Sequence, residues 1–335
     1  MRVAVIGAGG WGTGLSVLAA RAGCEVRLWS RSAAVVEEIN ARRSNSAYLA
    51  GQEIPVGVRA TCDERDALRG AEIVLLAAPS HATRGVLERL RACVEPSMVF
   101  VSATKGVEVE TGMRISEVVA DVLGRQAAGR FVCLSGPSFA REAAAGQPTA
   151  VVAACEDEEL SRRVQAALSV KNFRVYTNRD TVGTELGGAS KNVMALAAGM
   201  IAGLGFGANS VAALITRGLA EMTRLALAEG ARVETLAGLA GLGDLVLTCT
   251  GGLSRNRHVG EELGRGRKLD EVLAGMNEVA EGVRTTRAIK LLASRRGVEM
   301  PITNEVHAVL YEGKAARDAV ESLMSRPLKD EIEFK

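Results

Sequence analysis

The chain begins with VAVIGAGGWGTGL at residues 3–15, an apolar run that leads directly into a Gly-x-Gly-x-x-Gly turn. This pattern predicts a buried strand at Arg2–Ile6 and a helix at Thr13–Ala22, joined by the glycines. In such a turn the first glycine, Gly7, permits the sharp bend, and the second, Gly9, lets the backbone approach a pyrophosphate. The spacing alone is weak, but a strand before it and a helix after it favour a dinucleotide site.

The helix after the turn supports this interpretation. Its N-terminus presents unpaired N–H groups and the positive end of the helix dipole, and both attract phosphate. The third glycine, Gly12, lets this helix pack closely against the strand. The alternative is a glycine-rich turn that serves packing alone.

Composition indicates the number of domains and excludes one class of partner. A chain of 335 residues is long enough for about two domains, and 47% hydrophobic with 24% charged residues is ordinary for a globular protein. The 41 Lys and Arg residues and 39 Asp and Glu residues leave a net charge of +2, without the positive excess that non-specific nucleic-acid binding needs. We therefore expect no nucleic-acid partner.

Cysteine and histidine usage indicates a reducing compartment and no metal centre. The six cysteines include no Cys-x-x-Cys pair, and the three histidines are scattered along the chain. Because a strand is expected from Arg2, we expect no signal peptide. The longest apolar helical stretch, Val193–Phe206, is too short and too rich in glycine to span a membrane, so a buried core helix explains it better. We expect a cytoplasmic protein without a membrane span.

The pattern of expected secondary structure changes near residue 180. Before that point, apolar strand-like runs alternate with helical segments, which predicts a parallel sheet covered on both faces. The expected strands are Arg2–Ile6, Glu25–Trp29, Glu72–Ala77, Met98–Ser102, Phe131–Leu134 and Thr149–Ala154, with a candidate seventh at Phe173–Thr177. The expected later helices are Thr184–Gly203, Ala212–Glu229, Ser254–Gly264, Leu269–Leu273, Val283–Ser294 and Thr303–Tyr311. We therefore expect an α/β fold, with a Rossmann-type doubly wound domain over residues 1–180 and an all-α domain over residues 181–335.

The residues after the second expected strand bear on the choice between NAD and NADP. An acidic residue there binds the ribose 2′-hydroxyl of NAD, whereas an arginine pairs with the 2′-phosphate of NADP. The sequence has Arg31 between two serines at this point and no carboxylate. We expect NADP(H) to be preferred and NAD(H) to be usable. The alternative is that Arg31 is an ordinary surface charge.

Two loops follow expected strands at the sheet edge where doubly wound folds bind ligands. The first contains Lys105, whose amine can reach a phosphate or a substrate oxygen; the alternative is a solvated loop lysine. The second reads SGPSFA from Ser135 to Ala140, and it predicts a helix N-terminus near Ser138 that faces the same crevice. An ordinary strand-to-helix turn is the alternative there.

Lys191 is nearly alone as a charge in a long apolar helical stretch. Gly187 and Gly188 lie four and three residues before it, on the same helix face. Because a helical glycine costs about 1 kcal/mol relative to alanine, the pair indicates close approach of a ligand or of another backbone. A desolvated lysine has a lowered pKa and can exchange protons near neutrality. The alternative is a lysine that extends its amine to solvent at a helix end.

A second glycine-rich region contains AGLGD followed by TCTGGLSRNR. Ser254 is a good N-cap for the helix that follows, so Arg255 and Asn256 stand at a helix start suited to an anion. This segment is a candidate site for a small phosphate separate from the cofactor. Asp244 lies among glycines and leucines, where a carboxylate does not serve a core.

Eight motifs occur in order along nearly the whole chain: GAGGWGT, ATKG, GPSFA, ELGG with SKN, ITRGLAEM, GLGDLVLTCT, SRNR and VAEGVRTT. With this ordered set the sequence resembles the bacterial-type NAD(P)-dependent glycerol-3-phosphate dehydrogenases. The resemblance implies reversible reduction of dihydroxyacetone phosphate to sn-glycerol 3-phosphate, which supplies glycerophospholipid synthesis. The family and the apolar helices of the second domain also suggest a homodimer.

The resemblance implies roles for individual residues. Together with the glycines of the first turn, the expected cofactor-binding set is Gly7, Gly9, Gly10, Trp11, Gly12, Arg31, Lys105, Ala140, Arg255, Val279 and Glu281. The expected substrate-binding set is Lys105, Gly136, Ser138, Lys191, Asp244, Ser254, Arg255 and Asn256. Lys191 would be the catalytic acid and base, and Lys105 would orient the substrate and stabilise negative charge.

Three positions depart from the family pattern. Ala208 and Val211 stand where an Asp or Asn and a basic residue are common, and Ser190 replaces an apolar residue. They bear on local packing and subunit contacts rather than on the reaction. Two other classes stay open: a two-domain dehydrogenase for a β-hydroxy acid or hydroxyacyl thioester, and a non-catalytic NADP-binding sensor. The SRNR segment with Asp244 argues against the first, and Asp244 together with the two lysines argues against the second.

Overall fold

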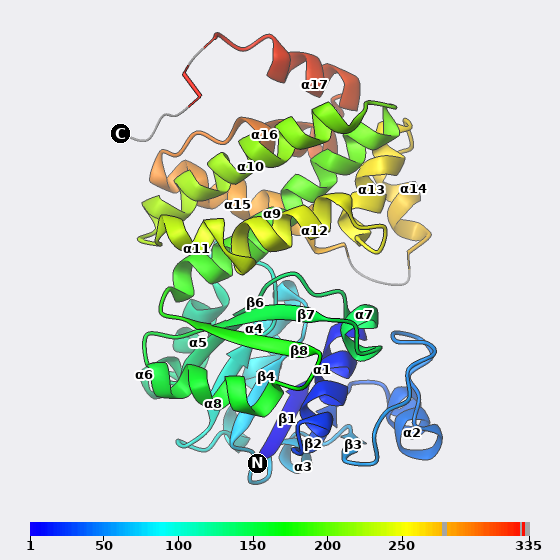
Figure 1. The fold of residues 1–335 in the computed structure, drawn as a ribbon, viewed down its shortest axis with the longest axis vertical. Coiled ribbons are helices and arrows are strands. Elements are labelled where there is room, and N and C mark those ends of the chain that lie inside the picture. Colours follow the sequence, from blue (N-terminus) through cyan, green and yellow to red (C-terminus); the bar gives the residue numbers. More distant parts are fainter. Residues whose placement is uncertain (277–279, 329, 332–335) are drawn as a thin grey trace.

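The chain forms one region built on a β-sheet, blue to green in Figure 1, and a second region of packed helices, green to red. The computed structural model describes residues 1–276, 280–328 and 330–331. The last strand ends at Asn178, and the first helix of the second region begins at Thr181. The change from alternating strands and helices to helices therefore falls near residue 180, as expected. A domain boundary between residues 180 and 181 stays a prediction.

Eight strands form a single sheet in the order β3-β2-β1-β4-β5-β6-β7-β8. Their bounds are β1 Arg2–Ile6, β2 Glu25–Trp29, β3 Val58–Thr61, β4 Ile73–Leu76, β5 Val99–Ser102, β6 Phe131–Ser135, β7 Thr149–Ala154 and β8 Phe173–Asn178. The strand order reverses between β1 and β4, which is the doubly wound arrangement. Ligands bind such sheets at the carboxyl ends of the strands, beside the point of reversal. The expected α/β class is confirmed.

Helices cover both faces of the sheet because consecutive strand residues point to opposite sides. In β1, Val3 and Val5 belong to one apolar core, and Ala4 and Ile6 belong to the other. The first core contains α1 Gly10–Arg21, α2 Ala33–Arg42, α7 Ala140–Ala144 and α8 Glu158–Leu168. The second contains α3 Glu64–Leu68, α4 Ser80–Leu90, α5 Ile115–Leu123 and α6 Arg125–Ala128, and a short 3-10 turn, Arg91–Cys93, follows α4. The continuously apolar strands are thus buried on both faces, as predicted.

The sheet differs from the expectation in two respects. β3 was not predicted, because only alternate residues of this short strand are buried. The sheet is also mixed rather than wholly parallel, since β7 runs antiparallel to β6 while β8 runs parallel to β7. The reason is that the chain after β6 stays at the carboxyl edge, where α7 packs against α1, instead of crossing back over the sheet.

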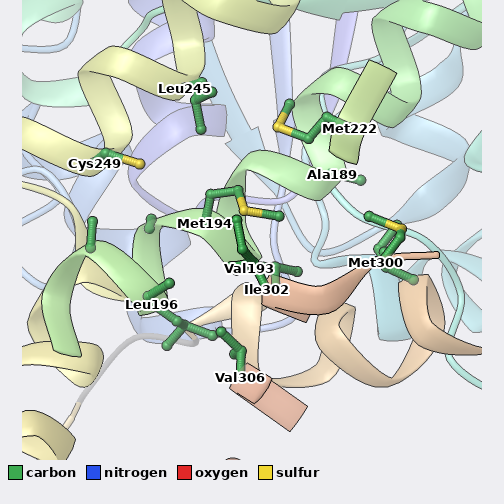
Figure 2. Packing of buried hydrophobic residues seen from close by; sticks show 14 of the residues in the cluster. Ala189, Val193, Met194, Leu196, Met222, Leu245, Cys249, Met300, Ile302 and Val306 are labelled. Carbon is green, nitrogen blue, oxygen red and sulfur yellow. The ribbon is translucent and has the colours of Figure 1, made fainter. Parts of the chain in front are cut away.

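α9, Thr181–Gly203, is the central helix of the second region, and every residue from Gly183 to Ile201 is buried. Around it lie α10 Ala208–Ala228, α11 Val233–Ala237, a π-helical turn η2 Leu239–Gly243, α12 Asp244–Thr250, α13 Arg255–Gly264, α14 Leu269–Ala274, α15 Glu281–Arg296, α16 Pro301–Tyr311 and α17 Ala316–Met324. Figure 2 shows Val193 and Met194 of α9 within the apolar core that these helices share. Among the described residues, no helix combines the length and apolarity that crossing a membrane requires.

α9 and α13 pack backbone against backbone. A Cβ placed on Gly260 of α13 would lie 2.0 Å from the carbonyl oxygen of Leu196, and one on Gly199 of α9 would lie 2.0 Å from that of Arg257. We call this the α9–α13 glycine contact; its members are Gly199, Gly203, Gly260 and Gly264. Because no side chain separates the two helices, the start of α13 is held at a fixed distance from α9.

Candidate active site

The glycine turn after β1 has the conformation that the sequence predicts. Gly7 has φ of 115°, which favours glycine, and its N–H donates to the Trp29 carbonyl oxygen at 3.0 Å. A Cβ on Gly12 would lie 1.8 Å from the Gly7 carbonyl oxygen, so α1 packs directly onto the turn. A Cβ on Gly9, the N-cap of α1, would contact nothing within 4 Å. The turn therefore leaves the helix N-terminus open, as phosphate binding requires.

Other residues expected at the cofactor surround the start of α1. Gly10 is its first residue, and the half-buried Trp11 ring lies 6.4 Å from the Phe173 ring between centroids. Ala140 of α7 packs against α1, since a Cβ on Gly14 would lie 3.5 Å from the Ala140 carbonyl oxygen. Ala140 at the start of α7 therefore lies beside α1, the helix that follows the glycine turn.

Arg31 follows β2 and is exposed, next to the serine that caps α2. β2 and β5 are separated by β1 and β4 in the sheet, so their carboxyl ends stand about 14 Å apart at ordinary strand spacing. Arg31 thus lies well away from Lys105, which follows β5. An extended dinucleotide can bridge such a separation.

Lys105 connects the loops after β5 and β6 with the helical region. Its Nζ donates to the Gly136 carbonyl oxygen at 2.8 Å, to Ser138 Oγ at 3.1 Å and to Asp244 Oδ2 at 2.9 Å. Gly136 has φ of 130°, and a Cβ there would lie 2.9 Å from the Val151 Cα. The solvated-lysine alternative is therefore wrong for Lys105.

The helix expected near Ser138 begins two residues later. α7 starts at Ala140 and has five residues. Ser138 stays in the turn because its hydroxyl donates to the Gly136 carbonyl oxygen at 2.9 Å and accepts from Lys105. Ser138 therefore holds the lysine rather than the helix.

Lys191 of α9 and Asp244 of α12 form the buried centre of the site. Lys191 Nζ donates to Asp244 Oδ1 at 2.6 Å and to Thr248 Oγ1 at 2.8 Å. The side chains of Lys191 and Asp244 are 7% and 1% exposed. Since the other Asp244 oxygen accepts from Lys105, one carboxylate bridges two lysines, one from each region of the chain.

The buried setting changes the chemistry of Lys191. Burial lowers the pKa of its amine to about 8, Asp244 opposes this shift, and Lys105 adds to it. The amine therefore changes protonation close to neutral pH, as a proton donor and acceptor must. The alternative of a lysine that reaches solvent at a helix end is wrong.

The paired glycines before Lys191 admit other parts of the protein. A Cβ on Gly187 would lie 2.6 Å from the Ala240 carbonyl oxygen of η2, and one on Gly188 would lie 2.6 Å from Ser135 Oγ of β6. α9 can thus press against both the sheet and the segment that carries Asp244. Close approach of another backbone, one of the two expected explanations, is confirmed for Gly187.

A chain of amide hydrogen bonds ties the loop after β5 to three helices. Asn192 Nδ2 donates to the Lys105 carbonyl oxygen, Asn256 Nδ2 donates to Asn192 Oδ1, and the Gly282 N–H donates to Asn256 Oδ1, each at 2.9 Å. Asn256 lies in the first turn of α13, where Ser254 is the N-cap, as expected, and Arg255 is exposed. The chain holds the start of α13 next to the lysines.

Glu281 lies at the start of α15, between the two regions. Its Oε1 accepts from the Ser80 N–H of α4 at 2.9 Å, and a Cβ on Gly106 would lie 2.5 Å from its Oε2. Burial raises the pKa of this carboxyl group. Glu281 is thus adjacent to the Lys105 loop, whereas Val279 falls outside the described residues.

The residues present fit a nicotinamide dinucleotide. The open N-terminus of α1 suits a pyrophosphate, and Arg31 and Lys105 follow β2 and β5, which lie on either side of β1 and β4 in the sheet. Among the described residues, no group of three or more His, Cys, Asp or Glu side chains could hold a metal ion.

Two family models match consecutive parts of the chain. The NAD-dependent glycerol-3-phosphate dehydrogenase N-terminus matches residues 2–161, and the C-terminus of the same family matches residues 180–321. The chain belongs to the NAD-dependent glycerol-3-phosphate dehydrogenase family. The resemblance drawn from the ordered motifs is confirmed, and this family member is an oxidoreductase that uses a nicotinamide cofactor.

Individual relatives within the glycerol-3-phosphate dehydrogenase family are similar over their full length. The glycerol-3-phosphate dehydrogenase (NAD(P)+) of Koribacter versatilis is 57% identical over 333 residues, covering 99% of each chain. That of Geobacter sulfurreducens is 54% identical over 330 residues, covering 98% of each. A crystal structure of the glycerol-3-phosphate dehydrogenase of Coxiella burnetii has a TM-score of 0.92 at 40% identity, covering 97% of this chain and 99% of that one.

Two side chains at the centre of this family member's site were not singled out from its sequence. Thr248 accepts from Lys191, and Asn192 holds the Lys105 loop. Thr248 lies four residues after Asp244, so helical spacing puts both on one face and could have indicated it. Asn192 directly follows Lys191 in the sequence, and helical spacing does not indicate that its side chain takes part in the site.

The three positions that depart from the family pattern lie on α9 and α10. Ser190 is buried, and its Oγ has no hydrogen-bond partner among the described residues. Ala208 is the exposed first residue of α10, and the half-buried Val211 packs against the helical core. An effect of these three positions on packing rather than on the reaction stays a prediction.

Proposed function

We propose that this chain catalyses the reversible, NAD(P)H-dependent reduction of dihydroxyacetone phosphate to sn-glycerol 3-phosphate in the cytoplasm, supplying glycerophospholipid synthesis. The observation that carries the proposal is the buried Asp244 carboxylate that bridges Lys191 and Lys105. This bridge combines a proton donor for a ketone oxygen with a second positive charge beside it. The names of the relatives support the same substrate.

Lys191 acts as the catalytic acid and base in this proposal. A bound NAD(P)H supplies the hydride to C2 of the substrate. Negative charge develops on the C2 oxygen, and the protonated amine of Lys191 donates a proton to it. In the reverse direction the neutral amine accepts that proton. A pKa of about 8 supports both roles, because both protonation states are populated near neutrality.

Lys105 orients the substrate and stabilises the charge on the oxygen. The Gly136 carbonyl oxygen and Ser138 hold its amine, which is the reason to assign both to the substrate site. Asp244 binds a substrate hydroxyl and favours the protonated form of Lys191, which is the form that donates a proton in reduction.

The substrate phosphate binds at the start of α13. Ser254 Oγ accepts the Arg257 N–H at 3.2 Å, so its own O–H can donate to a phosphate oxygen. Arg255 adds positive charge, and Asn256 has a second N–H beyond the one given to Asn192. The ten-residue helix directs the positive end of its dipole toward the same point.

NADP(H) is the preferred cofactor in this proposal, with NAD(H) also used. Arg31 supports the preference, because it is an exposed arginine in the position that reads the ribose 2′ group. The residues that would hold the rest of the cofactor are Gly7, Gly9, Gly10, Trp11, Gly12, Lys105, Ala140, Arg255, Val279 and Glu281.

We also propose a homodimer and a division into domains at residues 1–180 and 181–335. The family and the apolar helices of the second region support the dimer, and the change from alternating strands and helices to helices after Asn178 supports the division. Light scattering of the purified protein measures the first directly.

The deciding experiment follows the near-ultraviolet absorbance of NADPH, and separately of NADH, with dihydroxyacetone phosphate as the sole oxidant. Rapid oxidation with NADPH favoured over NADH supports both the reaction and the role of Arg31. Failure to oxidise either cofactor, by protein shown to bind NADPH, would overturn the proposed substrate.

A further inference from the structure

Glu185 of α9 is a buried carboxylate that is held by the sheet region. It accepts the Ser116 N–H at 2.8 Å, the Ser116 hydroxyl at 2.6 Å and Arg114 Nη1 at 3.1 Å. Its side chain is 5% exposed. Because Glu185 and Lys191 lie on the same helix, these bonds tie the helix of the proposed proton donor to the other region of the chain.

The contact completes the start of α5. This helix begins at Ile115, and its N-cap residue, Arg114, has no side-chain oxygen to accept the N–H groups of the first turn. Glu185 accepts the N–H of Ser116 in its place, and its negative charge meets the positive end of the helix dipole. A residue of the helical region therefore caps a helix of the sheet region.

Arg114 also closes the loop that carries Lys105. A β-bridge pairs Arg114 with Val107, two residues after Lys105. At the start of the loop, Asn192 donates to the Lys105 carbonyl oxygen. Glu185 and Asn192 are seven residues, or about two helical turns, apart, so they share one face of α9. Both ends of the loop are thus fixed to that face.

Stability alone does not require a charge at this position. Burial raises the pKa of Glu185, and Arg114 opposes the shift, so the carboxylate is costly to hold there. Replacing a buried ion pair by well-packed apolar residues is often neutral or stabilising. Geometric control of the loop is a better reason for the pair.

We infer that Glu185 is a positioning residue that, through Arg114 and Ser116, sets the placement of Lys105 relative to Lys191. The inference rests on the proposed function, in which both amines act on one substrate. The two lysines come from different regions and meet at Asp244 with distances of 2.9 Å and 2.6 Å. A small displacement of the loop against α9 would break one of these bonds.

Glu108 provides a matched control. Its carboxylate lies in the same loop, its side chain is 7% exposed, and it accepts from Arg84 at 2.8 Å and 3.0 Å. Arg84 and Thr111, its partners, belong to the sheet region. Glu108→Gln therefore makes the same chemical change without touching α9.

The test compares Glu185→Gln with Glu108→Gln in the full-length protein. For Glu185→Gln we expect kcat with dihydroxyacetone phosphate to fall about tenfold or more, because a shift of the order of 1 Å at a reacting group has such an effect. The dissociation constant of NADPH should stay within about twofold, and amide hydrogen exchange over residues 105–116 should accelerate. Glu108→Gln should lower kcat by less than about threefold, and Glu185→Asp, which keeps the carboxylate, should recover part of the loss.

Equal losses of kcat in the two glutamine variants, in step with their losses of Tm, would reduce Glu185 to a stabilising role and overturn the inference. Unchanged hydrogen exchange around Ser116 in Glu185→Gln would overturn the cap itself. If Glu185→Gln does not fold, Glu185→Asp takes its place in the same comparison. An inactive wild-type protein would overturn the proposed function and the catalytic part of the inference, while the exchange rates would still decide whether Glu185 fixes the loop.

Discussion

Asp244 determines what Lys191 and Lys105 can do. An unpaired amine as buried as that of Lys191 would be neutral at pH 7, because burial disfavours its charged form. The carboxylate opposes this shift, and Lys105 on its other oxygen limits the opposition. The balance among the three groups brings the pKa of one amine near the pH at which it must work.

Lys191→Ala removes the proposed proton donor and leaves the glycine turn untouched. We expect kcat for reduction of dihydroxyacetone phosphate to fall by about 10²–10⁴-fold, the usual range for loss of a general acid. Steady-state kinetics measure this, and NADPH titration should give a nearly unchanged dissociation constant. The exposed Lys171→Ala is the control. Turnover close to wild type would end the assignment of Lys191.

The pH dependence of the reaction follows from the same amine. Since its protonated form is the donor and its pKa is about 8, kcat/KM for reduction should fall as pH rises through about 8, and that for oxidation should rise. Lys105→Met removes a positive charge that lowers the pKa of Lys191. The pKa of Lys191 should therefore rise, and kcat/KM for reduction by this variant should fall at a higher pH than that of the wild type. If kcat/KM for reduction falls at the same pH in this variant as in the wild type, another group is responsible for the pH dependence.

Arg31→Asp tests the choice of cofactor. The carboxylate would repel a 2′-phosphate and could accept from a 2′-hydroxyl, so kcat/KM with NADPH should fall far more than kcat/KM with NADH. Initial rates with each cofactor, at equal substrate, give the two ratios. The exposed Arg42→Asp, at the far end of α2, is a surface control. Equal losses for both cofactors would show that Arg31 does not read the 2′ group.

Residues defined by local spacing were predictable, and residues defined by packing were not. The position of Lys191 relative to its two glycines follows from helical periodicity alone. The bridge through Asp244 depends on where α12 packs against α9 and where β5 ends, and neither is encoded within a single motif. The sequence therefore indicated the charged residues of the site but not the bonds among them.

At the scale of elements, the contact between α9 and α13 is made by backbone at several glycines. Gly260→Ala would force a methyl group to within 2.0 Å of the Leu196 carbonyl oxygen. We expect a loss of about 1–3 kcal/mol or more in the free energy of unfolding, because rigid backbone cannot yield. Gly85→Ala in α4, where an added Cβ meets nothing within 4 Å, should instead gain about 0.5–1 kcal/mol. Urea unfolding compares the two, and similar effects at both positions would contradict the crowded contact.

Element types were predictable where apolar periodicity was strong. The strands of the sheet centre and the long helices α9, α10 and α15 appear where the pattern indicates them. β3 was missed because an edge strand of four residues buries too few side chains to produce a pattern. The direction of β7 could not be read either, since apolar content does not reveal whether a connection crosses the sheet.

For the molecule as a whole, the buried carboxyl group of Glu221 makes the free energy of unfolding depend on pH. Glu221 of α10 is 2% exposed and accepts the N–H groups of Ile302 and Thr303 at 2.5 Å and 3.3 Å, at the start of α16. Burial raises its pKa to about 7, against an ordinary value of 4.5. Since the folded state holds the proton more tightly, the contribution of Glu221 is fully present below pH 4.5 and is lost as pH rises through about 7.

Glu221→Gln removes this titration. Relative to the variant, the wild type should lose on the order of 3 kcal/mol of unfolding free energy between pH 5 and pH 8, as the difference of the two pKa values implies. Urea unfolding of both proteins at the two pH values measures it. Glu158→Gln, at an exposed carboxylate whose pKa is lowered by Arg162 and Arg179, should show no such trend. A constant difference between wild type and Glu221→Gln would contradict the assignment.

The α9–α13 glycine contact also bears on how this protein could be made more robust. Replacing glycines inside helices by alanine is a common first step in raising thermal stability, because it restricts the unfolded chain. A designer working from the sequence would begin with Gly199, Gly203, Gly260 and Gly264, each of which lies within a helix or at its last residue. In this fold a Cβ added at any of the four would lie 2.4 Å or less from a backbone carbonyl oxygen of the facing helix. We therefore expect any line of descent that keeps the two helices in this contact to keep glycine at all four positions.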